Sequence, residues 1–82
     1  MKLTIISPFS KKTMEIAWLE LNTPAGSFVI QPGHAPTILT LSPHKDVIFC
    51  LKSGKQESFV AKQGIVDINR TSATLILSDE LQ

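Results

Sequence analysis

Short apolar runs rich in β-branched residues recur along the whole 82-residue chain, separated by clusters of turn residues. The runs recur at intervals of roughly 8–12 positions, the spacing typical of all-β sandwiches and barrels. No window keeps the 3.6-residue period of an amphipathic helix, and residues 9–14 are too few and too polar to form one. The sequence therefore predicts an all-β fold, a small two-sheet β-sandwich of roughly 8–10 short strands, with residues 1–82 forming one domain.

The expected strands are bounded by turn residues. They cover residues 3–6, 14–22, 28–30, 37–41, 47–52, 56–63, 65–69 and 73–77. The last four make two hairpins, which turn around Ser53-Gly54 and around Arg70-Thr71.

The long second strand changes phase. Met14, Ile16 and Trp18 share one face, whereas Leu19 and Leu21 lie on the other. Side chains alternate with a period of two, so the change of face requires an extra residue. We expect a β-bulge near residue 17 that bends this strand around a corner of the sandwich.

The alternation of apolar residues defines the expected core. Its members are Leu3, Ile5, Leu19, Leu21, Phe28, Ile30, Leu39, Val47, Phe49, Phe59, Val66, Ile68, Leu75 and Leu77. This leaves Ile48 and Cys50 on the opposite face of their strand. Such a strand is either central between packed layers or in contact with a partner, and the sequence leaves both possibilities open.

A stiff loop with two prolines lies at residues 30–36. Pro32 sets φ near −65° and Gly33 tolerates positive φ, which are the requirements of the two central positions of a type II turn. Pro36 has no N–H for a sheet ladder, so it belongs at the start of a strand or on an edge. The loop holds His34 at its tip and, being already stiff, loses little entropy when it binds. These features indicate a docking surface.

The loop and its flanks resemble a known family. Residues 23–36, with Gln31-Pro32-Gly33-His34-Ala35-Pro36 at their centre, are similar to the "E-G-x-x-G-I-x-P-G-H-A-P-L-L-T" signature of the F-type ATP synthase epsilon subunit, called delta in mitochondria. Residues 63–68 resemble its "G-G-x-x-E-V" segment, and residues 74–80 its closing strand. The resemblance covers residues 3–80, and the P-G-H-A-P core is its most specific part.

Three positions depart from the family pattern. Val29 and Gln63 stand where the family has glycine, and His44-Lys45 replaces the glycine after Pro43. The family commonly carries a regulatory helical hairpin after the sandwich, whereas this sequence stops at Gln82. We therefore expect no C-terminal helical hairpin, and we do not transfer the family's regulatory or nucleotide-binding roles.

The resemblance implies a non-catalytic rotor subunit that links gamma to the c-ring and helps to transmit torque. It implies gamma contacts at Ser7, Gln31, Pro32, Gly33, His34 and Ala35, and c-ring contacts at Thr23, Pro24, Ala25, Gly26 and Ser27. It also implies a peripheral location on the cytoplasmic side of the inner (plasma) membrane. Trp18 is either a core residue or an interface aromatic.

Charge and hydropathy exclude some classes of partner. The formal net charge of +1 and the scattered basic residues provide no surface for nucleic acid. There is no apolar stretch near the ~20 residues that span a bilayer, so membrane association is expected only through the complex. The single cysteine, Cys50, lies in an apolar run, which favours a core thiol in a reducing compartment.

The sequence contains no convergent catalytic cluster, so no enzyme activity, cofactor or small-molecule substrate is expected. Two other functions are weighed against the rotor subunit. The first is a stand-alone β-sandwich adaptor that binds another protein through the same loop. The second is a small metal-dependent hydrolase that uses His34, His44 and Asp46, although two ligands on loops rarely form a metal site.

Overall fold

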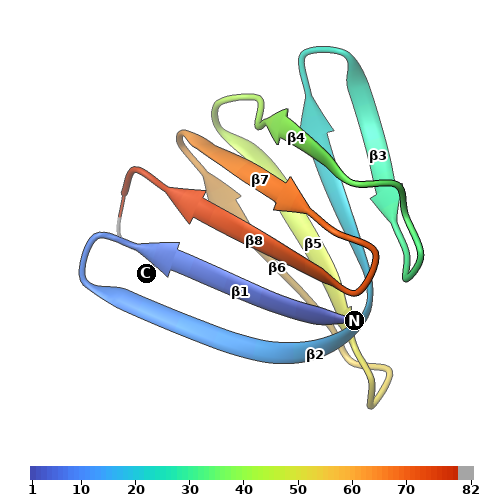
Figure 1. Ribbon diagram of the computed structural model, residues 1–82. Helices are drawn as coiled ribbons and strands as arrows, with labels where there is room; N and C mark the ends of the chain where they lie inside the picture. The colour runs from blue at the N-terminus through green and yellow to red at the C-terminus, as the bar shows by residue number, and fades with distance from the viewer. Residues whose placement is uncertain (80–82) are drawn as a thin grey trace.

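The chain forms eight β-strands, and the described residues contain no helix, as the sequence predicts (Figure 1). The computed structural model describes residues 1–79. Its strands are β1 (Lys2–Ser7), β2 (Ser10–Thr23), β3 (Gly26–Ile30), β4 (Thr37–Thr40), β5 (Lys45–Leu51), β6 (Gln56–Ala61), β7 (Gly64–Ile68) and β8 (Ser72–Leu77). Glu80, the last residue of the segment that resembles the family's closing strand, lies outside the described residues.

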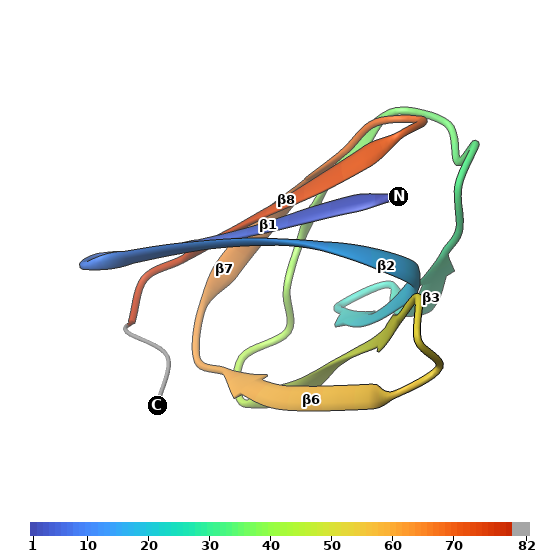
Figure 2. The ribbon, with the colours of Figure 1, turned by 90° about the horizontal axis from the view of Figure 1, so that it is seen from below.

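Two sheets share the long strand β2. The strands follow the order β4-β7-β8-β1-β2-β5-β6, and β3 pairs with β2. The first half of β2 pairs with β1 in what we call the first sheet, which also contains β8, β7 and β4. Its second half pairs with β3 and β5 in the second sheet, which β6 completes. Figure 2 shows β1, β7 and β8 in one layer and β6 in the other, so the predicted two-sheet β-sandwich is confirmed.

The predicted bulge in β2 is confirmed. The register with β5 shifts between Ile16 and Trp18, which brackets Ala17. The bulge brings Ile16 onto the same face as Leu19, and both are fully buried. Grouping Ile16 with Trp18 on the face opposite Leu19 was therefore wrong, because the extra residue between them reverses the alternation.

The expected core is largely confirmed. All of its members except Phe28, Leu39 and Phe59 are buried, and these three are half-buried against the core. They lie on β3, β4 and β6, each of which pairs with only one neighbouring strand. The other edge of each strand has no neighbouring strand to cover the side chain. The structure adds residues that the pattern missed: Met1, Ile16, Leu41, Ala61 and Ala73.

The second strand begins earlier than predicted. The strand was expected to begin at Met14, but Lys11 and Lys12 pair with Ile6 and Ile5 of β1. The partner strand supplies the backbone hydrogen bonds, and this pairing outweighs the weak strand preference of lysine.

Candidate functional site

The loop between β3 and β4 has the conformation that its prolines and glycine predict. Gly33 has a φ of +89°, and the His34 N–H donates to the Gln31 carbonyl at 3.1 Å, which closes the turn. The Nδ1 atom of His34 lies 2.8 Å from the Ala35 carbonyl oxygen and donates this bond in the tautomer protonated at Nδ1. The half-buried ring thus ties down its own loop.

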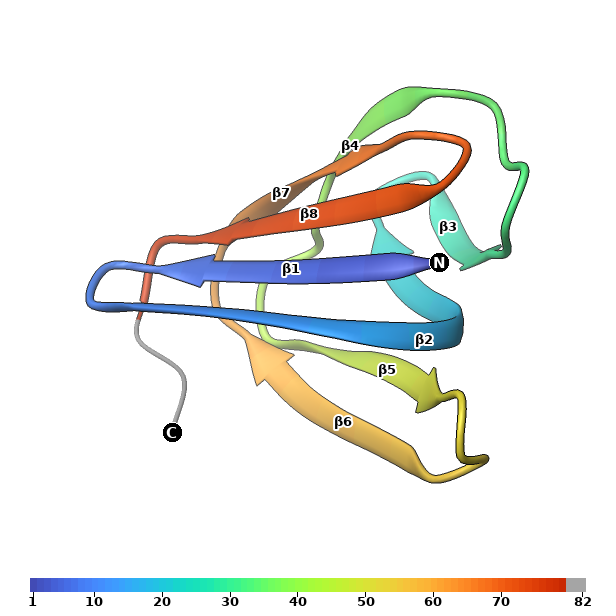
Figure 3. The ribbon, with the colours of Figure 1, turned by 60° about the horizontal axis from the view of Figure 1, so that its bottom comes forward.

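The loop is also anchored to the turn between β7 and β8. The Gly33 N–H donates to the Arg70 carbonyl at 2.7 Å, and the Nη1 atom of Arg70 donates to the Gly33 carbonyl at 3.3 Å. Figures 1 and 3 show the two connections side by side at one end of the sandwich. A loop held at its tip presents its outer residues in one arrangement, as a docking surface requires.

Ser7, the other residue expected at the gamma side, lies away from the proline loop. It ends β1 at the hairpin to β2, which lies at the opposite end of the molecule in Figure 3. Ser7 is only 6% exposed, and its hydroxyl forms a hydrogen bond with the hydroxyl of Ser10. The structure therefore separates Ser7 from the other residues expected at the gamma side.

The turn between β2 and β3 forms a second exposed corner, at the other end of β3 from the proline loop (Figure 1). Residues 24–27 are exposed. The Thr23 hydroxyl accepts from the Ala25 N–H at 3.1 Å and donates to the Gly26 carbonyl at 3.0 Å, while the Ser27 hydroxyl donates to Asn22 Oδ1 at 2.8 Å. Side-chain hydrogen bonds at Thr23 and Ser27 therefore order the polar corner expected at the c-ring.

Trp18 lies on the outer face of the second sheet. It is half-buried and stands opposite Cys50 on β5. Ile48 lies on the same face of β5, since the alternate residues Val47 and Phe49 are buried in the core. Trp18, Ile48 and Cys50 are thus neither core residues nor fully exposed, which leaves their side chains available to a partner.

The sequence did not single out an isoleucine row on the outer face of the first sheet. Ile65 of β7 stands opposite Ile76 of β8, and Ile76 stands opposite Ile6 of β1. Ile65 and Ile76 are 42% and 44% exposed, and Ile38 of β4 on the same face is 67% exposed. The available signal was that Ile65 and Ile76 alternate with the core residues of their strands, as Ile48 and Cys50 do on β5.

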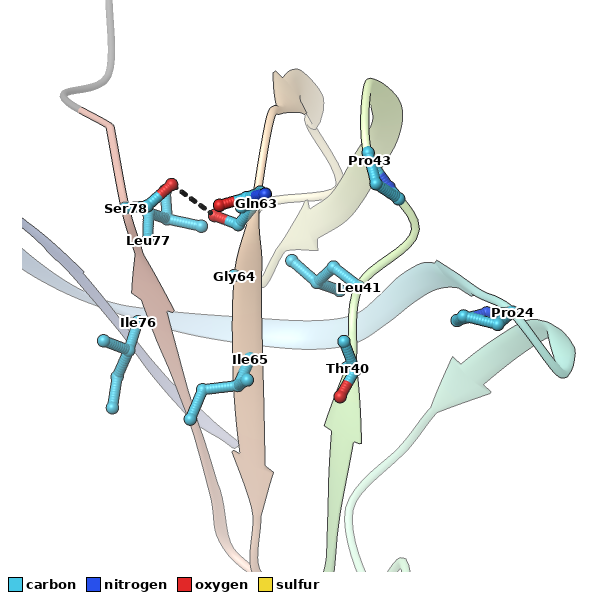
Figure 4. A pocket seen from close by; sticks show the side chains of 10 residues that line it. All are labelled: Pro24, Thr40, Leu41, Pro43, Gln63, Gly64, Ile65, Ile76, Leu77 and Ser78. Atoms are coloured by element: carbon cyan, nitrogen blue, oxygen red, sulfur yellow. Dashed lines mark hydrogen bonds between the residues drawn. The ribbon is translucent and has the colours of Figure 1, made fainter.

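A hollow of about 510 Å³ adjoins the isoleucine row (Figure 4). Its apolar lining is Pro24, Leu41, Pro43, Ile65, Ile76 and Leu77. Gly64 also lines it, and an added Cβ there would lie 2.9 Å from the Ile76 carbonyl oxygen and 2.9 Å from Leu77 Cδ2. The glycine is therefore required by close approach of the neighbouring strand.

The structure does not arrange His34, His44 and Asp46, the residues of the alternative metal-dependent hydrolase, as a metal site. His34 precedes β4, whereas His44 and Asp46 follow it. Within residues 1–79, no group of three or more His, Cys, Asp or Glu side chains is arranged to hold a metal ion. The same residues include no helix that is long and apolar enough to cross a bilayer.

Comparison with solved structures shows the same fold in two ATP synthases. A chain of the Euglena gracilis mitochondrial ATP synthase, in a cryo-EM structure of OSCP, F1 and the c-ring, matches with a TM-score of 0.86 and 20% identity. A chain of the Tetrahymena thermophila mitochondrial ATP synthase central stalk and c-ring matches with a TM-score of 0.82 and 16% identity. The matches cover 94% and 96% of this chain, but only 49% and 63% of those chains.

No curated protein sequence matches the chain significantly. The family model described as "ATP synthase, Delta/Epsilon chain, beta-sandwich domain" matches residues 1–81. This match extends over nearly the whole sequence and includes both exposed corners and the isoleucine row. The chain therefore belongs to the family of ATP synthase delta/epsilon β-sandwich domains.

Proposed function

We propose that this chain is a non-catalytic central-stalk subunit of a rotary F-type ATP synthase, which links gamma to the c-ring and helps to transmit torque. The observation that carries the proposal is the family match over residues 1–81. The fold of two mitochondrial ATP synthase chains supports it.

Torque transmission requires a body that does not yield between its two contacts. Here two hydrogen-bonded sheets share β2, so a load on one sheet passes to the other through continuous backbone. The close-packed interior resists deformation. The proline loop is held to the β7–β8 turn by two hydrogen bonds, so it moves with the sandwich.

The two exposed corners suit two simultaneous partners. We assign Gln31, Pro32, Gly33, His34 and Ala35 to gamma, and the corner at Thr23, Pro24, Ala25, Gly26 and Ser27 to the c-ring. Residues 28–30 of β3 lie between them, so Ser27 and Gln31 are about 14 Å apart at 3.4 Å per residue. Each stable contact needs about 800 Å² per partner, so gamma must cover more than the loop. A gamma surface that also reaches Ser7 would extend along the first sheet.

In this role the protein uses no cofactor, metal, nucleic acid or small-molecule substrate. It is peripheral, held at the cytoplasmic side of the inner (plasma) membrane through the complex. Trp18 is a further candidate contact, on the outer face of the second sheet.

Co-purification with purified gamma subunit tests the proposal. We expect the tagged 82-residue chain to retain gamma at micromolar concentration. Ala35→Glu in the exposed loop should weaken retention, whereas Ser53→Glu, an exposed matched control in the turn between β5 and β6, should not. A wild-type chain that retains no gamma would refute the rotor function and leave the stand-alone adaptor.

A further inference from the structure

We infer that the end of the sandwich that carries the β1–β2 hairpin binds the surface of an anionic phospholipid bilayer, with Phe9 entering the headgroup layer. The proposed function attaches the chain to the membrane through protein partners alone. This inference adds a direct contact with lipid, and it does not depend on gamma.

Phe9 lies at the tip of the β1–β2 hairpin. It is 92% exposed, more than any other large apolar side chain in residues 1–79, and Pro8 beside it is also exposed. An aromatic ring held in water forgoes the free energy that its burial would release. A partner that accepts apolar groups therefore gains from contact with this tip.

The hairpin projects from the body of the sandwich. Residues 10–15 of β2 pair with β1, whereas the pairing of β2 with β5 begins at Ile16. Among the described strands, none therefore covers the other edge of this segment. Figure 3 shows the hairpin extending past the ends of β5 and β6, so its tip reaches a flat surface before they do.

The hairpin shares its end of the sandwich with the polar corner. β1 runs parallel to β8, so both strands end there, and β7 begins there because Gly64 stands opposite Leu77. After β4, the Leu41 N–H donates to the Gly64 carbonyl at 3.0 Å. The next N–H, of Ser42, donates to the Asn22 carbonyl at 2.8 Å. A single rim thus connects the hairpin to the corner that we assign to the c-ring, and both can face the membrane.

This rim is basic. Its exposed lysines lie on the hairpin, at the start of β5 and in the β6–β7 turn: Lys11, Lys12, Lys45 and Lys62. Two carboxylates, Asp46 and Asp79, lie beside them. Within residues 1–79 none of the four lysines is in an ion pair. Their ammonium groups are therefore available to anionic headgroups, to which each adds attraction.

The ring and the nearest lysines match the layers of a bilayer. Lys11 and Lys12 point to opposite faces of the hairpin, two and three residues behind Phe9, or about 7–10 Å at 3.4 Å per residue. Apolar groups of interfacial segments enter the headgroup boundary by about 5–10 Å. When the Phe9 ring is buried there, both ammonium groups lie near the lipid phosphates, and their long stems adjust the depth.

Co-sedimentation of the full chain with vesicles tests the inference. We expect binding to an equimolar mixture of phosphatidylcholine and phosphatidylglycerol to exceed binding to pure phosphatidylcholine by about tenfold, and to fall as salt is added. Phe9→Ser should weaken binding to the anionic vesicles by about tenfold. The matched control is Ile38→Ser, which removes a 67% exposed side chain from β4 and should have little effect.

A second pair of variants separates local charge from net charge. Lys11→Gln/Lys12→Gln and Lys52→Gln/Lys55→Gln both lower the formal net charge from +1 by two. Lys52 and Lys55 are exposed in the β5–β6 turn, at the other end of β5 from the rim. Only the first pair should abolish the preference for anionic vesicles, and circular dichroism establishes that all variants are folded.

Insertion is measured with Phe9→Trp in a Trp18→Phe background. We expect the emission of the tryptophan introduced at position 9 to shift to the blue on anionic vesicles and to be quenched by brominated lipid. No binding to anionic vesicles, an equal loss in both lysine pairs, or an unshifted emission would overturn the inference. These measurements contain no gamma, so their failure leaves the rotor function standing, and a failure to retain gamma leaves the lipid contact standing.

Discussion

Gly33 and Arg70 are 37 residues apart in the sequence and are joined by two hydrogen bonds. The Gly33 N–H donates to the Arg70 carbonyl at 2.7 Å, and the Arg70 guanidinium donates to the Gly33 carbonyl at 3.3 Å. The tip of the proline loop is thereby held to the turn between β7 and β8. One bond uses only backbone atoms and the other requires the arginine side chain, so the two can be separated by mutation.

The first prediction concerns this anchor. Arg70→Ala removes the side-chain bond but keeps the backbone bond, so we expect a loss of at most about 1 kcal/mol in the free energy of unfolding. The Gly33 amide should exchange with solvent faster, because the loop opens more often. Hydrogen exchange measured by NMR checks this. Arg70→Lys is the control for charge, and an unchanged exchange rate in Arg70→Ala would show that the guanidinium does not hold the loop.

The second prediction concerns Gly64. Gly64→Ala should destabilise the protein by about 1–3 kcal/mol, because the added methyl overlaps the Ile76 carbonyl and Leu77 and the backbone must shift. Denaturant unfolding measures the loss.

Gly33→Ala provides the comparison for the Gly64 variant. At Gly33 an added Cβ meets nothing within 4 Å, but the φ of +89° is unfavourable for alanine. Gly33→Ala should therefore lose stability through backbone strain alone. A second substitution, Leu77→Ala, should relieve part of the strain in Gly64→Ala but none in Gly33→Ala. Equal rescue of both variants would contradict the packing argument.

The third prediction uses neighbours on opposite faces of β2. Leu19 is fully buried and Trp18 is half-buried on the outer face. Leu19→Ala should cost about 2–5 kcal/mol of unfolding free energy, and Trp18→Ala should cost less despite the larger side chain removed. Urea unfolding followed by circular dichroism compares the two variants. A larger loss for Trp18→Ala would place its ring in the core.

The fourth prediction concerns His44, which has a φ of +59° in the turn after Pro43. A β-branched residue is strongly disfavoured there, so His44→Val should lower Tm by several degrees, given about 4–8 °C per kcal/mol for a domain of this size. His44→Gly should stay close to the wild-type Tm. Glycine relieves the backbone strain at this positive φ, and this gain offsets the greater conformational entropy of the unfolded chain. A His44→Val variant as stable as His44→Gly would exclude the conformational explanation.

Features that depend on neighbouring residues in the chain were predictable. The turn at Pro32-Gly33 and the bulge around Ala17 both follow from local backbone geometry and from the two-residue period of a strand. The family signature was likewise readable, because it is a contiguous stretch of sequence. The loop, the polar corner and most of the core could therefore be assigned without coordinates.

Features that depend on strand order required the tertiary structure. Lys11 and Lys12 form a strand because β1 pairs with them, and Ser7 is remote from the loop because β1 runs to the opposite end of the sandwich. The isoleucine row exists because β1, which is distant in sequence from the β7–β8 hairpin, pairs with β8. Alternation along each strand assigns a residue to a face, but only the pairing between strands decides which residues of different strands share a surface.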